Sequence, residues 1–153
     1  MKKPRILITS AREALRYVMR HFCDPGTGGW PEKTDTYAAI SIQDTIGGGF
    51  GFELKENRFC KGVLTLYFDD IEEPERGLKL MDPAQAKCII NFIRDHQDVD
   101  TLLIHCFAGV SRSRAVGVFA AELLELPPID EKYFNEHVYG TLKRVWRVET
   151  GIT

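Results

Sequence analysis

The stretch His105-Cys106-Phe107-Ala108-Gly109-Val110-Ser111-Arg112-Ser113 carries the strongest fold signal in this chain. It follows the short apolar run Thr101-Leu102-Leu103-Ile104, which is typical of a buried strand, and precedes the largely apolar run 114–126, which favours a helix. A helix N-terminus exposes unpaired backbone N–H groups and the positive end of the helix dipole. The order strand, loop, helix therefore predicts an anion-binding loop at residues 106–112.

The residue types in this loop suit a bound phosphate group. Gly109 can adopt positive φ at no steric cost, which lets successive N–H groups turn inward as a nest. Arg112 presents a planar fork of donors that matches two phosphate oxygens. Cys106 faces the helix terminus and the guanidinium, so we expect a thiolate that can attack an electrophile held in the loop. The expected phosphate-binding residues are Phe107, Ala108, Gly109, Val110, Ser111 and Arg112.

Two neighbouring residues complete the predicted loop. Ser113 can donate a hydrogen bond to the sulfur of Cys106, and His105 can orient the loop through its backbone. A cysteine and an arginine separated by five residues also occur by chance, and a buried cysteine usually acts as a small hydrophobic residue. The full pattern His-Cys-x-x-Gly-x-Ser-Arg-Ser between a strand and a helix is much more restrictive.

The segment 105–113 resembles the signature loop of the cysteine-dependent protein tyrosine phosphatases. Its part 108–113 is most similar to the dual-specificity branch and to small prokaryotic relatives. The similarity extends over residues 60–126, with a strand over 63–68, Asp69-Asp70 after it, and a helix from about 83 to 94. The resemblance implies an α/β, three-layer fold with a central, mostly parallel sheet flanked by helices, formed as a single domain over residues 1–153.

Phosphate transfer to a thiolate needs a proton donor for the leaving oxygen, and the family supplies an aspartate from an upstream loop. Here Asp69 and Asp70 follow the strand ending at Phe68, at the carboxyl edge where open α/β sheets bind ligands. We favour Asp70, because the Phe-Asp-Asp-Ile pattern resembles relatives that keep the second aspartate. Asp69 is the alternative acid, and both could instead be solvated turn carboxylates.

The resemblance implies a phosphomonoester hydrolase, a protein tyrosine or dual-specificity phosphatase, that works through a phosphocysteine intermediate. Cys106 attacks phosphorus, Arg112 and the loop amides stabilise the oxygens, Asp70 acts as acid, and Ser113 assists thiolate departure. No metal and no cofactor are required. The expected substrate is a phosphorylated protein or a small phosphomonoester. The apolar residues Phe107, Ala108 and Val110 disfavour a highly charged inositol headgroup without excluding it.

Two other functional classes remain open. A rhodanese-like sulfurtransferase also uses a loop thiolate before a helix, but the hydroxyl after Arg112 and the upstream aspartates argue against it. A phosphotyrosine-binding pseudophosphatase would keep the pocket and lose a catalytic group, whereas Cys106, Arg112 and an aspartate are all present. A thiosulfate assay distinguishes the first alternative, and slow turnover with tight phosphopeptide binding would identify the second.

Composition predicts an ordinary globular domain. The chain has 153 residues, of which 44% are hydrophobic and 27% charged, and a net charge of -2. No overall positive field attracts nucleic acid or anionic lipid, so we expect neither nucleic-acid nor membrane partners, and attraction of phosphate must be local. Arg12, Arg16 and Arg114 are further cations that usually lie on a solvated surface. No apolar run approaches the roughly 20 residues of a membrane span.

Cysteine usage indicates a reducing compartment. Cys23, Cys60, Cys88 and Cys106 show no paired spacing, and the sequence has no signal-peptide pattern, so neither a disulfide framework nor a zinc site is expected. We therefore expect a cytoplasmic location.

The remaining elements follow from periodicity and caps. Strands are expected over 5–8, 37–42 and 60–68. Ser10 with Glu13 predicts a capped helix over 11–21. Asp82-Pro83 predicts the start of the helix that ends at 94, and Asp130 is expected to cap a last helix that reaches about 148. Residues 44–59 stay uncertain, with a short helix or strand possible. Trp30-Pro31-Glu32 is interpreted as part of a turn-rich connection, and the glycine-rich segment 47–51 as a mobile surface loop without nucleotide-loop spacing.

Overall fold

The structure is a computed structural model that describes residues 2–22 and 29–151. Its centre is a four-stranded sheet in the order β1-β4-β2-β3, and every strand pair is parallel. The strands are β1 (Arg5–Thr9), β2 (Tyr37–Gln43), β3 (Cys60–Tyr67) and β4 (Thr101–His105). The predicted α/β class with a parallel sheet is confirmed.

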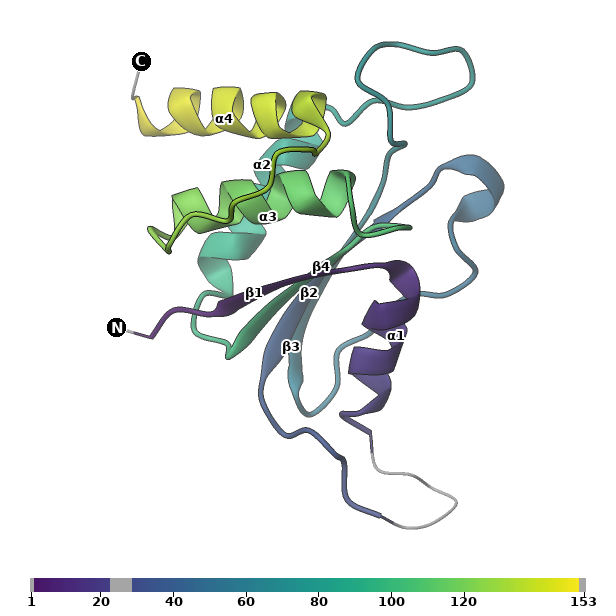
Figure 1. Cartoon of the computed structure of the whole chain (residues 1–153), viewed down its shortest axis with the longest axis vertical. Helices are drawn as coiled ribbons and strands as arrows, with labels where there is room; N and C mark the ends of the chain where they lie inside the picture. The colour runs from purple at the N-terminus through teal and green to yellow at the C-terminus, as the bar shows by residue number, and fades with distance from the viewer. Residues whose placement is uncertain (1, 23–28, 152–153) are drawn as a thin grey trace.

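Helices cover both faces of this sheet (Figure 1). One face carries α1 (Ala11–Met19), and the other carries α2 (Pro83–Asp95), α3 (Arg112–Leu123) and α4 (Glu136–Thr150). The helix α3 contacts β1 and β4, while α4 packs against α2 and α3. This arrangement explains why the central strands read as continuous apolar runs: they are buried on both faces.

Alternate residues of the central strands supply the two cores. Ile40 and Ile104 belong to the larger core beneath α2, α3 and α4, whereas Ala39 and Leu103 belong to the smaller core beneath α1. Successive side chains of a strand point to opposite faces, so each strand feeds both cores. The parallel register pairs Ile40 with Ile104 and Ala39 with Leu103.

Two of the helix starts follow the predicted capping chemistry. The hydroxyl of Ser10 accepts the N–H of Glu13 at 3.1 Å, and the Glu13 carboxylate accepts the N–H of Ser10 at 3.2 Å. At α2, Asp82 accepts the N–H of Gln85 at 2.8 Å, with Pro83 at the first helical position. Both capping boxes satisfy backbone donors that a helix otherwise leaves unpaired.

The predicted cap of the last helix is wrong. Asp130 lies in the non-helical connection after α3, and α4 begins at Glu136 with Asn135 as its N-cap. The Asn135 side-chain oxygen accepts the N–H of Val138 at 3.0 Å, while its amide donates to the carbonyl of Ile71 at 3.0 Å. Because this tertiary contact reinforces the cap, the helix starts five residues after the sequence-based position.

The helix α3 begins at Arg112, two residues before the predicted start, so Arg112 and Ser113 lie in its first turn. It packs closely on β1: a Cβ added to Gly117 would lie 2.3 Å from Cδ1 of Ile8. The sequence left the structure of segment 44–59 uncertain; its one regular element in the structure is a short 3₁₀ helix, Ile46–Gly48. Of the turn-rich connection before β2, Cys23 and residues 24–28 lie outside the described residues.

Candidate functional site

The loop 106–111 joins the carboxyl end of β4 to the N-terminus of α3, as the strand, loop, helix order predicts. Cys106 is 2% exposed, and its Sγ accepts the backbone N–H of Gly109 at 3.3 Å. The Oγ of Ser113 lies 3.1 Å from the same sulfur. A backbone N–H and a side-chain hydroxyl thus converge on one sulfur at the N-terminus of α3.

Gly109 makes the tight loop possible. Its φ is 79°, in the left-handed region that glycine adopts readily. A Cβ at this position would lie 2.6 Å from the backbone nitrogen of Ser10 and from the carbonyl carbon of Thr9. The loop is fastened to the same turn by the N–H of Ala11, which donates to the carbonyl of Phe107 at 2.9 Å. Any side chain at Gly109 would push the loop off this support.

Arg112 is 3% exposed, and one end of its guanidinium is fixed. Its Nη1 donates to the carbonyl of Phe68 at 2.7 Å and pairs with Oδ1 of Asp44 at 2.8 Å. The buried Nε has no hydrogen-bond partner among the described residues. An unsatisfied buried donor is costly, so Nε lacks the acceptor that a buried N–H group needs.

Asp44 is a site residue that the sequence analysis missed. It directly follows β2, at the same carboxyl edge of the sheet as the loop after β4. The rule that ligands bind at this edge could have found it, because Asp44 is the first carboxylate after a central strand. Its contact with Arg112 supplies the counter-charge that holds the guanidinium in place.

His105 is buried between the loop and β2. Its Nδ1 lies 3.0 Å from the carbonyl oxygen of Cys106, which can only accept, so Nδ1 donates. Its Nε2 lies 2.6 Å from Oγ of Ser41, which in turn accepts from Nε2 of Gln43 at 3.2 Å. Burial, aided by the charge of Arg112, lowers the pKa of His105, so the ring stays neutral and Nε2 accepts from Ser41.

The two neighbouring aspartates have different surroundings. Asp70 is exposed, and its Oδ1 accepts the hydroxyl of Ser111 at 2.7 Å and the side-chain amide of Asn135 at 2.8 Å. The N–H of Asn135 also donates to the carbonyl of Ser111 at 3.3 Å. Asn135, which the sequence analysis did not single out, thus links Asp70 to the loop 106–111.

Asp69 is turned the other way and buried. It accepts the N–H and the hydroxyl of Thr45, at 3.1 Å and 2.5 Å, and the N–H of Lys79 at 2.8 Å. Burial alone would raise the pKa of Asp69, but the hydrogen bonds from Thr45 and Lys79 outweigh it and lower the pKa below its ordinary value. Asp69 is therefore ionised, and its hydrogen bonds link the connection after β2, which contains Thr45, to the residues before α2, which include Lys79.

Aromatic residues border one side of the loop. Phe107 is 63% exposed, and its ring centroid lies 5.5 Å from that of Phe50. Phe50 belongs to the glycine-rich segment, whose predicted surface position is confirmed, and its N–H donates to Oε1 of Gln43 at 2.8 Å. Phe52 stacks on His105 with centroids 5.8 Å apart. The glycine-rich segment therefore forms an apolar border beside the loop.

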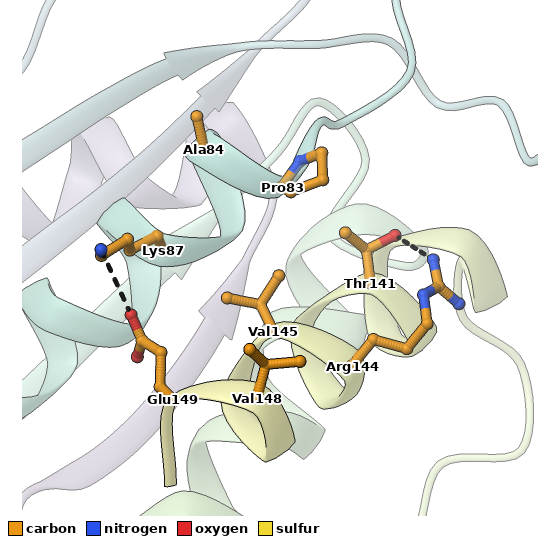
Figure 2. Close-up of a pocket in the computed structure, with 8 residues that line it drawn as sticks. All are labelled: Pro83, Ala84, Lys87, Thr141, Arg144, Val145, Val148 and Glu149. Atoms are coloured by element: carbon orange, nitrogen blue, oxygen red, sulfur yellow. Dashed lines mark hydrogen bonds and ion pairs between the residues drawn. The ribbon is translucent and has the colours of Figure 1, made fainter. Parts of the chain in front are cut away.

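A separate cavity of about 490 Å³ lies between α2 and α4 (Figure 2). Its walls include Val145 and Val148, and its rim carries the ion pair between Nζ of Lys87 and Oε1 of Glu149 at 3.8 Å. The described residues that line it include no residue of the loop 106–111 and no cysteine, serine or histidine.

Other features bear on alternative sites. Cys60, Cys88 and Cys106 are free thiols, and Cys23 lies outside the described residues. Across residues 2–22 and 29–151, no group of three or more His, Cys, Asp or Glu side chains is placed to hold a metal ion. None of the helices in that part of the chain is long and apolar enough to cross a membrane.

Comparison with known proteins found no matching protein-family model, no similar curated protein and no similar solved structure.

Proposed function

We propose that this chain is a phosphomonoester hydrolase of the cysteine-dependent protein tyrosine or dual-specificity type. The observation that carries the proposal is the convergence on one loop of a hydrogen-bonded Cys106 sulfur and the buried guanidinium of Arg112, whose Nε lacks a partner in the described chain. A nucleophile and a cation separated by five residues, with the Gly109 N–H directed at the sulfur between them, suit a tetrahedral dianion.

In the first step, the Cys106 thiolate attacks phosphorus and forms an S–P bond while the P–O bond to the leaving group breaks. Arg112 and the loop N–H groups stabilise the charge on the equatorial oxygens. A proton moves from the carboxyl group of Asp70 to the departing oxygen, because an alkoxide is a poor leaving group. The products are phosphocysteine and an alcohol or phenol.

In the second step, water attacks phosphocysteine and releases inorganic phosphate. The carboxylate of Asp70 takes the proton of the attacking water, and the S–P bond breaks to restore the thiolate. Ser113 lies 3.1 Å from this sulfur and stabilises its returning charge with a hydrogen bond. The step restores the protonated acid and the free nucleophile, so neither a metal nor an organic cofactor enters the cycle.

Asp70 is the proposed acid because of where its carboxylate is held. It contacts Ser111, a member of the phosphate-binding loop, at 2.7 Å, whereas Asp69 is committed to Thr45 and Lys79. A general acid must lie within reach of the leaving oxygen, and a side chain already in contact with the loop meets this condition. The exposed position of Asp70 also leaves its second oxygen open toward a substrate.

The borders of the loop favour phosphoproteins over inositol phosphates. Phe107 and Val110 are 63% and 50% exposed, and Phe50 lies beside Phe107. An apolar border suits the aromatic ring or the methylene groups of a phosphorylated side chain. A polyphosphorylated headgroup would instead need several cations around the loop.

Hydrolysis of p-nitrophenyl phosphate in the presence of a metal chelator tests the proposal. We expect turnover by the wild-type protein and its loss in Cys106→Ser, because serine is a poor nucleophile without an adjacent base. Cys88→Ser is the matched control, since Cys88 is an exposed free thiol on α2. Equal activity of Cys106→Ser and wild type would overturn the proposal, as would transfer of sulfur from thiosulfate without phosphatase activity.

A further inference from the structure

A second surface feature begins next to the phosphate-binding loop. A groove of about 450 Å³ runs between α1 and the edge strand β1. Its lining includes Leu7, Thr9, Glu13, Arg16, Met19 and Arg20. Met19 is 68% exposed, which gives the groove an uncovered apolar contact beside its charged side chains.

Thr9 lies between the groove, which it lines, and the loop, against which its backbone packs. Thr9 is the last residue of β1, and a Cβ on Gly109 would lie 2.6 Å from its carbonyl carbon. Leu7 lies two residues earlier on the same strand, so the groove leads away from the loop along the sheet edge. A segment that enters the loop with one residue can therefore continue into the groove with its neighbours.

The helical wall carries two arginines, Arg16 and Arg20. Arg12 lies one turn before Arg16 on α1, outside the groove lining, and all three arginines are exposed. Arg20 pairs with Glu32 at 3.6 Å, whereas Arg12 and Arg16 form no ion pair within the described ranges. These charges stand out because the chain as a whole has a net charge of -2.

The carboxylate of this wall is already engaged. Glu13 accepts the N–H and the hydroxyl of Ser10 at 3.2 Å and 3.0 Å in the capping box of α1. Its negative charge lies at the positive end of the helix dipole, where it stabilises α1. Arg16 is left as the groove cation without a carboxylate partner in the described chain.

We propose that this groove binds an acidic segment that flanks the phosphorylated residue of a protein substrate; the proposal rests on the phosphatase function. An extended peptide advances by about 3.3 Å per residue, whereas α1 rises by only about 1.5 Å per residue. A few peptide residues therefore span the part of α1 from its start to Arg16, so Arg16 meets side chains about two to four positions from the phosphorylated residue. The free edge of β1 offers backbone groups with which such a segment can pair.

Two phosphopeptides that differ only in their flanking residues, Asp and Glu in one and Gln in the other, test the groove. For the wild-type protein we expect a higher kcat/KM on the acidic peptide, and the difference should shrink as salt is raised. In Arg16→Glu, kcat/KM on the acidic peptide should fall about fivefold or more relative to that on p-nitrophenyl phosphate, because attraction becomes repulsion.

Arg147→Glu is the matched control, since Arg147 is an exposed residue of α4, on the opposite face of the sheet (Figure 1). It should keep the wild-type preference for the acidic peptide. Turnover of both peptides with equal kcat/KM, or an unchanged preference in Arg16→Glu, would overturn the groove and leave the phosphatase function standing. Absence of turnover on the peptides and on p-nitrophenyl phosphate would instead overturn the phosphatase function itself.

Discussion

The hydroxyl of Ser111 donates a hydrogen bond to Oδ1 of Asp70 at 2.7 Å, which joins the connection after β3 to the loop 106–111. The preceding residue, Asp69, points in the opposite direction and accepts hydrogen bonds from Thr45 and Lys79. Two adjacent carboxylates at the bend after β3 thus face different surroundings. These surroundings are the reason why we propose Asp70 as the acid and give Asp69 a structural role.

Replacement of Asp70 by asparagine should remove the proton donor. We expect kcat for an alkyl phosphate to fall by about 10²–10⁴-fold, and kcat for an activated aryl phosphate to fall less, because its leaving group needs little protonation. Steady-state kinetics of both substrates would check this difference; unchanged kcat values in Asp70→Asn, with the loss in Asp69→Asn instead, would reverse the assignment.

Replacement of Asp69 by asparagine should weaken folding. Asparagine has one acceptor oxygen where aspartate has two, so at least one charged hydrogen bond to Thr45 or Lys79 is lost, at a cost of about 2–3 kcal/mol. The pKa of Asp69 is lowered on folding, so its stabilisation is complete above the unfolded value of about 3.9 and is lost as pH falls through the folded value. Urea unfolding should therefore show a gap between wild type and variant at pH 7 that narrows toward pH 3; a constant gap would contradict this account.

His105 should make folding sensitive to mild acid. Burial lowers its pKa, so below the unfolded value of about 6.5 the unfolded chain takes up a proton that the folded chain does not. The free energy of unfolding should therefore fall as pH drops below about 6.5, and this fall should be smaller in His105→Asn. Chemical denaturation of both proteins from pH 8 to pH 5 measures the difference, and parallel curves would show that His105 does not titrate in this way.

Asn135 caps α4 and also contacts Asp70, and substitutions can remove these two interactions separately. Serine at this position can still cap α4, but its shorter side chain cannot reach Asp70, whereas alanine does neither. We expect kcat to fall about tenfold in both Asn135→Ser and Asn135→Ala, because the acid loses its fixed position. Only Asn135→Ala should also lose about 1 kcal/mol of helix capping. Wild-type kcat in Asn135→Ser would show that the contact with Asp70 has no catalytic effect.

Local chemistry explains which features the sequence could predict. The loop 105–113 and the capping boxes at Ser10 and Asp82 depend on residues a few positions apart, and all of them lie where the pattern indicates. Asp44 and Asn135 meet Arg112 and Asp70 across long stretches of chain, 65 positions in the second case. The spacing of residues along the sequence does not predict such contacts, because the topology of the sheet brings these residues together.

The same reasoning accounts for the misplaced start of α4 and for the choice between the aspartates. Asp130 is a good cap by residue type, but Asn135 gains additional contacts to Asp70 and Ile71 that only the folded chain provides. By residue type alone Asp69 and Asp70 have equal chemistry, and only the resemblance of the Phe-Asp-Asp-Ile pattern favoured Asp70. Their separation required the positions of Thr45 and Ser111, which belong to other connections of the sheet.

The covalent intermediate is the central claim, and rapid quenching tests it most directly. Wild-type protein is mixed with a phosphomonoester, quenched in acid during turnover, digested and analysed by mass spectrometry. We expect one phosphoryl group on the peptide that contains Cys106 and none in Cys106→Ser. Asp70→Asn should accumulate more of it with an activated aryl substrate, because hydrolysis of the intermediate lacks its base. Turnover without a phosphorylated Cys106 peptide, or with the phosphoryl group on another residue, would rule out a phosphocysteine intermediate.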